Sequence, residues 1–190
     1  PQWPNSGEID IIETIHAEQT DHTTLHTKDG CAMEAADDKL FSGSWSTGSN
    51  GAPATNCYVH APAQYANQGC GVLDPPGSAG SSFNNAGGGV YAAEWNATGI
   101  RVWFFPRGKV PLDLSATGSP QPGSSDLWVE PIAWFPLGAQ CSPDHFSKLS
   151  MVFDLTFCGA WAGSDFPSLC PGLGASCSDF VRNNTKDFDE

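Results

Sequence analysis

The pattern of apolar and polar residues predicts short β-strands joined by turns. Residues 7–13 combine isoleucines with acidic residues, and the isoleucines favour an extended strand. Residues 151–158 carry a large apolar side chain at every second position, which is typical of a strand with one face against a core. The apolar positions expected to face that core are Met151, Phe153, Leu155 and Phe157.

Two regions are expected to form strand–turn–strand units. The first runs from Gly7 to about Thr27, with a polar turn around residues 18–21. The second pairs residues 90–95 with residues 100–105 across the turn Asn96-Ala97-Thr98-Gly99. We expect Gly99 to take the positive φ of a hairpin bulge, and Trp103 on the second strand to serve the core.

The first predicted strand carries three carboxylates within six residues. Side chains alternate along a strand, so Glu8 and Asp10 share a face, whereas Glu13 would point to the other side. A β-bulge at Ile11 or Ile12 would return Glu13 to the face of the other two, and such bulges are common beside active sites. The alternative is a solvated strand face, although carboxylates crowded together repel one another and give a purely structural strand no benefit.

The bulged spacing suits one kind of chemistry. Glu8 and Glu13 would have Cα atoms about 13 Å apart, and side chains leaning together could bring the carboxyl carbons to roughly 5–6 Å. Retaining glycosidases need about 5–5.5 Å between nucleophile and acid/base, and inverting enzymes need roughly 6.5–9.5 Å. The charge of Asp10 would help Glu13 to stay protonated. The spacing therefore favours retention.

Composition supports an all-β fold. The 190 residues are enough for one domain with a substantial core. The chain holds 21 Gly and 15 Pro but only 15% charged residues, and these turn formers separate aromatic and β-branched runs. The combination predicts a β-sandwich of two antiparallel sheets. Residues 29–88 are largely irregular, and a loop region of this length is usually functional.

The net charge limits the partners. It is −13, which weighs against nucleic acid, anionic membranes and acidic polysaccharides, whereas a neutral glucan remains compatible. No run of residues approaches the length of a transmembrane helix.

The cysteines indicate an oxidising, secreted setting. Seven are present, without the spacing of a zinc site, and an odd count leaves one unpaired within this chain. Cys57 and Cys70 could close the loop between them, but the full connectivity stays open. Asn96-Ala97-Thr98 and Asn183-Asn184-Thr185 are possible N-glycosylation acceptors.

Several segments together resemble a known family. Trp3-Pro4-Asn5-Ser6-Gly7-Glu8-Ile9-Asp10-Ile11-Ile12-Glu13 is similar to the active-site strand of glycoside hydrolase family 16, in its bulged Glu-x-Asp-x-x-Glu form. The strongest likeness is to fungal endo-1,3(4)-β-glucanases, which are laminarinase-like enzymes. Residues 24–27, 94–105 and 155–163 support the resemblance.

The resemblance implies a fold and a set of roles. The fold is a β-jelly-roll sandwich with a substrate cleft across its concave sheet. Glu8 would be the nucleophile and Glu13 the acid/base, with Asp10 orienting and tuning the pair. The residues implied to contact substrate are Trp3, His26 and Trp161. A further candidate for the substrate-binding set is Glu94, which either faces solvent from its strand or hydrogen-bonds a sugar hydroxyl. No cofactor is required. Some relatives hold a structural calcium ion, which we cannot place in this sequence.

The resemblance also suggests a partial domain. In the family, several strands precede the active-site strand and a last strand follows, so we expect residues 1–190 to be one catalytic domain lacking those strands, and to be monomeric. Two rivals to the hydrolase remain, namely a cell-wall transglycosylase on the same scaffold and a non-catalytic glucan-binding relative. The choice between β-1,3 and mixed β-1,3/1,4 linkages also stays open.

Overall fold

The computed structural model describes residues 2–34, 36–114, 118–123 and 128–188, and the chain forms two compact units. The first unit comprises Pro1–Glu13 and Gln19–Leu149, and the second comprises Thr14–Glu18 and Ser150–Glu190. All strands that the structure describes belong to the first unit.

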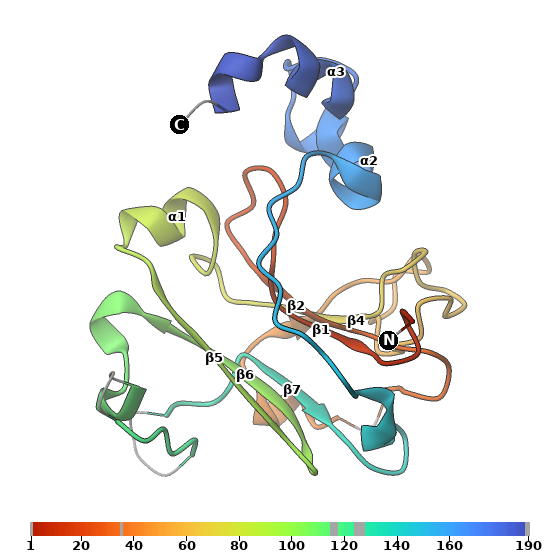
Figure 1. Cartoon of the computed structure of the whole chain (residues 1–190), viewed down its shortest axis with the longest axis vertical. Helices are drawn as coiled ribbons and strands as arrows, with labels where there is room; N and C mark the ends of the chain where they lie inside the picture. The colour runs from red at the N-terminus through yellow and green to blue at the C-terminus, as the bar shows by residue number, and fades with distance from the viewer. Residues whose placement is uncertain (1, 35, 115–117, 124–127, 189–190) are drawn as a thin grey trace. The chain divides into compact units, whose positions relative to one another are not determined.

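The first unit contains two antiparallel sheets (Figure 1). The four-stranded sheet has the order β1 (Glu8–Glu13), β2 (His22–His26), β4 (Cys70–Leu73) and β3 (Ser44–Trp45). The three-stranded sheet has the order β5 (Gly89–Asn96), β6 (Gly99–Pro106) and β7 (Ala133–Pro136). The all-β prediction is confirmed.

Helical elements are short. The unit has one α-helix, α1 (Gly80–Asn85), among its described residues. Single 3-10 turns occur at Asp38–Leu40, Arg107–Lys109, Leu112–Leu114 and Pro143–His145.

One apolar core joins the two sheets. Leu25 and Val72 from the first sheet pack in the same cluster as Ile100, Val102 and Phe135 from the second. These five side chains are fully buried, and they occupy alternate positions of their strands, as the period of two requires. The sheets therefore pack face to face, and the opposite face of each is left for other contacts.

The hairpin of β5 and β6 has its predicted register, with Asn96 paired to Gly99. The predicted positive φ at Gly99 is wrong, because Gly99 is not among the residues with positive φ. The reason for glycine is a close approach instead: a Cβ at this position would collide with the ring of Trp134 on β7. Trp103 is 3% exposed, which confirms its place in a core.

Disulfides fix the long irregular region to the first unit. Cys57 is bonded to Cys70, as predicted, and Cys31 is bonded to Cys141. The second of these joins segments 110 residues apart in the sequence. Each bond removes freedom from the unfolded chain.

The second unit is helical. It contains α2 (Gly159–Leu169), α3 (Cys177–Asn183) and a 3-10 turn at Thr185–Phe188, and the disulfide Cys158–Cys177 joins the start of α3 to the residue before α2. Phe166 of α2 packs on Phe180 of α3, with ring centroids 5.6 Å apart. Cys170 is the one free cysteine, as the odd count predicts.

Two sequence predictions in this region are wrong. Residues 151–157 form no strand, and Phe153 and Leu155 are more than 90% exposed. An alternating pattern of apolar side chains decides which face of a strand would meet a core. A strand also needs a neighbouring strand for its backbone hydrogen bonds, and no described residue pairs with this segment. Trp161 lies in α2 and not in a turn.

Among the described residues, no helix has the length and apolar character needed to cross a membrane.

Candidate active site

The first strand has the predicted bulge. Asp10 pairs with Thr24 and Glu13 pairs with His22, so three steps along β1 match two steps along β2. One extra residue is therefore absorbed between Asp10 and Glu13, and the alternation of side chains shifts by one from that point on. Glu13 consequently shares a face with Glu8 and Asp10. We call these three residues the acidic triplet.

The triplet lies on the face of the sheet that points away from the core. Ile9 and Ile11 pack against the core cluster, whereas Glu8, Asp10 and Glu13 stay half-buried on the other side. The isoleucines thus anchor the strand and hold the acids outward. This is the physical reason for mixing β-branched and acidic residues in one strand.

The strand begins at a glycine that no other residue could replace easily. Gly7 has a φ of 73°, and a Cβ there would lie 2.5 Å from the carbonyl oxygen of His145. An L-residue would meet both backbone strain and a collision. The close packing around Gly7 therefore fixes the place at which the acidic strand starts.

Two of the acids have partners. The indole N–H of Trp3 donates to Glu8 Oε2 at 2.6 Å, and His26 Nε2 lies 3.1 Å from Asp10 Oδ2. Trp3 is 49% exposed, so much of its ring remains open to a ligand. These bonds orient Glu8 and Asp10 before any substrate arrives.

The environment of Glu13 suits a proton donor. Burial and the nearby charge of Asp10 raise the pKa of Glu13, with a smaller contribution from Glu8, while His26 opposes the shift. A carboxyl group whose pKa is raised remains protonated nearer to neutral pH and can act as a general acid.

His26 is held close to the triplet by charge. Burial of its ring works to lower the pKa, but the hydrogen bond to Asp10 and the charges of all three acids outweigh it and raise the pKa of His26. Its partner on β1 is Glu8, directly opposite across the strands. The structure thus brings His26 and Trp3 together with the triplet, and their contacts to substrate stay predictions.

Donor atoms of Glu8, Asp10 and His26 lie within 4.8 Å of one another, which is close enough to share a metal ion. The hydrogen bond between Asp10 and His26 accounts for much of this proximity. The arrangement does not need an ion to explain it.

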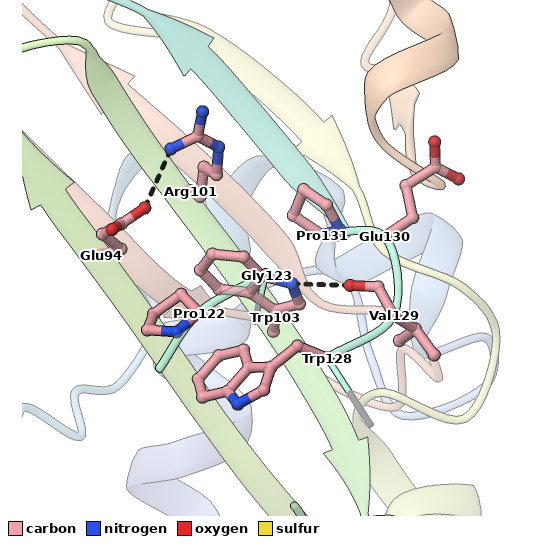
Figure 2. Close-up of a pocket in the computed structure, with 9 residues that line it drawn as sticks. All are labelled: Glu94, Arg101, Trp103, Pro122, Gly123, Trp128, Val129, Glu130 and Pro131. Atoms are coloured by element: carbon pink, nitrogen blue, oxygen red, sulfur yellow. Dashed lines mark hydrogen bonds and ion pairs between the residues drawn. The ribbon is translucent and has the colours of Figure 1, made fainter. Parts of the chain in front are cut away.

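Glu94 lies elsewhere. It belongs to β5 of the other sheet, where its Oε2 accepts from Arg101 Nη1 at 2.9 Å (Figure 2). It lines a pocket together with Trp103 and Trp128, and this pocket contains no member of the triplet (Figure 2). Trp161 belongs to the second unit. The structure does not bring Glu94 together with the triplet, and the substrate contacts of Glu94 and Trp161 stay predictions.

Comparison with known proteins identifies the scaffold. The family description "XgeA-like, catalytic GH16 domain" matches residues 1–190. The chain belongs to glycoside hydrolase family 16.

Relatives within family 16 carry related names. A probable glycosidase of Schizosaccharomyces pombe is 48% identical over 99% of this chain and 42% of its own length. An endo-1,3(4)-beta-glucanase of Arthroderma benhamiae is 37% identical over 99% of this chain and 39% of its own length. The chain thus spans about two fifths of these curated relatives.

Solved family 16 structures match with TM-scores near 0.8. An elongating β-1,3-glucosyltransferase matches with a TM-score of 0.80 and 36% identity, over 100% of this chain and 60% of that one. Laminarinase 16A from Phanerochaete chrysosporium, solved with β-glucans in donor and acceptor sites, matches with a TM-score of 0.78 and 39% identity, over 99% of this chain and 59% of that one. These neighbours confirm the jelly-roll fold.

Two buried acids were not predicted from the sequence. Asp21 is 0% exposed and Asp74 is 4% exposed, although Asp21 was expected in a polar turn. They lie on the core side of the sheet, behind the bulge. No local sequence signal marks them, because their burial follows from the pairing of β2 with β4.

Proposed function

We propose that this chain is the catalytic core of a retaining endo-hydrolase acting on β-1,3- or mixed β-1,3/1,4-glucan. One observation carries the proposal, namely the bulge that places Glu13 on the face of Glu8 and Asp10 in a family 16 scaffold. The structurally similar laminarinase, which was solved with β-glucans bound, supports the substrate class.

The first half-reaction uses both glutamates. Glu8 attacks the anomeric carbon, the bond from that carbon to the leaving oxygen breaks, and the Glu13 proton moves to that oxygen. The product is a covalent glycosyl-enzyme on Glu8. The raised pKa of Glu13 keeps the proton in place for this step.

The second half-reaction returns the enzyme to its starting state. Glu13, now a carboxylate, takes a proton from water as the water oxygen attacks the anomeric carbon, and the bond to Glu8 breaks. Two inversions give overall retention. Asp10, held by His26, orients the pair and keeps negative charge beside Glu13.

A second candidate function replaces water with a sugar acceptor. The glucosyltransferase that matches this chain with a TM-score of 0.80 favours it specifically. The chemistry up to the glycosyl-enzyme is the same, so the residues on β1 do not separate the two outcomes.

A product analysis tests both proposals. We expect laminarin and mixed-linkage glucan to yield shorter oligosaccharides whose new reducing ends appear first as the β-anomer in proton NMR. Oligosaccharides longer than the input would establish transfer. The α-anomer as first product would contradict the double displacement.

We also propose that the protein is secreted. Three disulfides and the fungal glucanase relatives support this. The side chain of Asn96 is exposed at the β5–β6 turn, which suits N-glycosylation. A mass decrease after treatment with a peptide N-glycosidase would confirm the modification, and an unchanged mass would contradict it.

A further inference from the structure

The core side of the bulge carries a polar cluster that the proposed chemistry does not use. We define it as Asp21, Thr23 and Asp74, all of which are less than 5% exposed. The Asp74 N–H donates to the Asp21 carbonyl at 2.9 Å, one step beyond the pair His22–Leu73. Asp21 and Asp74 are therefore directly opposite on neighbouring strands, and their side chains share the buried face.

This cluster contacts the backbone of the bulge at two points. The Thr23 hydroxyl lies 3.4 Å from the Ile11 carbonyl oxygen, inside the bulge. The backbone N–H of Glu13 faces the Asp21 carboxyl closely enough to lower its pKa, as does that of His22. The residues that contact the bulge from the core side thus lie behind the acid/base and not beside it.

The cluster has few side-chain donors for two charged carboxylates, and the backbone N–H groups of Glu13 and His22 face Asp21 without completing a hydrogen bond. Among the described residues, both oxygens of Asp21 and Oδ2 of Asp74 complete no hydrogen bond. Tyr91 of β5 gives its single hydroxyl proton to the Ser78 carbonyl at 2.7 Å. Thr23 has one proton for two acceptors, Ile11 O and Asp74 Oδ1, each at 3.4 Å.

Among the groups of the described residues that act on the two aspartates, none is a cation. The titratable groups that act on the two aspartates are Glu13 from β1 and Tyr91 from β5, besides the aspartates themselves. Two adjacent buried carboxylates without a cation cannot both be ionised at a tolerable energetic cost. At least one of them therefore holds a proton, and burial raises the pKa of both.

We infer that Asp21 is a positioning residue for Glu13 and acts through the backbone of the bulge. In this arrangement, a proton shared between Asp21 and Asp74 keeps the cluster in place. In the protonated form Asp74 donates to Thr23, which leaves the Thr23 proton for Ile11 O. Loss of that proton turns the Thr23 hydroxyl toward Asp74 and removes the donor from the bulge. The inference rests on the proposed acid/base role of Glu13.

The first test replaces Asp21 by Ala and by Asn. We expect Asp21→Ala to lower kcat roughly tenfold or more, with KM changed less than twofold, because a small displacement of the acid/base costs rate and not binding. We expect the Glu13 carboxyl, followed by carbon-13 NMR, to titrate at a lower pH in Asp21→Ala. Asp21→Asn keeps an oxygen facing the Glu13 N–H, so it should retain most of the activity and the wild-type titration.

A matched control separates positioning from general stability. Thr27 is also 0% exposed and has an unpartnered hydroxyl, but it follows the other end of β2, away from the bulge. Thr27→Val should change thermal stability without moving the Glu13 titration. If Asp21→Ala does not fold, Thr23→Val tests the second contact to the bulge, with a smaller shift expected in the same direction.

The outcomes are distinct. The Glu13 carboxyl could titrate at the same pH in the folded Asp21 or Thr23 variant as in Thr27→Val. That result overturns the positioning role. The NMR titration needs no turnover, so it decides this point even if the protein degrades no glucan. Absence of turnover in the wild type would count against the proposed function alone.

Discussion

Two groups of acids occupy opposite faces of the same sheet and have opposite surroundings. The acidic triplet is half-buried, and Trp3 and His26 bind two of its members. The carboxyl groups of the buried pair, Asp21 and Asp74, complete one side-chain hydrogen bond among the described residues, from Thr23 to Asp74. Both groups contain a carboxyl group whose pKa is raised.

The difference between them shows what makes a raised pKa useful. Glu13 stands on an open face, where a substrate oxygen could receive its proton. Asp21 is 0% exposed, so no substrate oxygen can reach its proton, and the same electrostatic effect serves structure there. The predictions below test this contrast.

The largest effect is expected at Glu8. Glu8→Gln keeps the size of the side chain and an acceptor for the Trp3 indole but removes the nucleophile. We expect a loss of at least about 10³-fold in kcat on laminarin, with the thermal transition unchanged within about 2 °C. Activity retained at more than a few per cent would overturn the assignment, and Glu94→Gln provides the same substitution outside the triplet.

Glu13→Gln should give a smaller, substrate-dependent loss. General acid catalysis contributes about 10²–10⁴-fold, and this contribution depends on how much the leaving group needs a proton. We expect a severe loss on laminarin. The loss should be much milder on a nitrophenyl β-laminaribioside, whose nitrophenol leaving group needs little protonation. Equal losses on both substrates would show that Glu13 is not the proton donor.

The buried pair should respond to pH through stability. Burial and the charge of Asp74 raise the pKa of Asp21 to about 9, and burial raises the pKa of Asp74 to about 7, from 3.8 for both. Between about pH 4 and pH 7, the folded protein keeps both protons, whereas the unfolded chain has lost them. Their contribution is complete below about pH 4 and is lost as the pH rises through 7 and then 9.

A variant isolates this contribution from other titrations. Asp74→Asn removes one of the two ionisations, so its thermal transition should fall less steeply with pH than that of the wild type. We expect the difference in Tm between variant and wild type to grow by roughly 5 °C between about pH 5 and pH 9. Parallel curves from differential scanning calorimetry would contradict a proton held by the pair.

The contrast between the acidic triplet and the buried pair also shows which features the sequence could predict. The bulge was predictable because its cause is local: acids and isoleucines alternate in six residues, and Glu13 falls one position out of phase. The β5–β6 hairpin was predictable for the same reason. Both signals lie within a few residues of the structure that they specify.

Features that depend on distant partners were not predictable. Asp21 looked like a turn residue, yet pairing with β4 buries it. β4 and β7 have only four residues each and lack an alternating pattern, so they become strands through neighbours far away in the sequence. Residues 151–158 show the reverse, because their alternating pattern has no paired strand among the described residues and forms none.

The smallest effect is expected at Glu94, a carboxylate in the second sheet that is paired with Arg101. Its pair with Arg101 is about one third exposed on both sides, so removing the charge should cost no more than about 1 kcal/mol of stability. The Arg101 guanidinium lies 3.7 Å from the Trp134 ring centroid, and this second contact should hold it in place. Because Glu94 lies in a pocket without the triplet, we expect Glu94→Gln to change kcat/KM on laminarin by less than twofold, which opposes the sugar contact considered for Glu94 from the sequence. A tenfold rise in KM in a variant with unchanged Tm would instead place Glu94 in the substrate site, and acids on both sheets would then serve the same reaction.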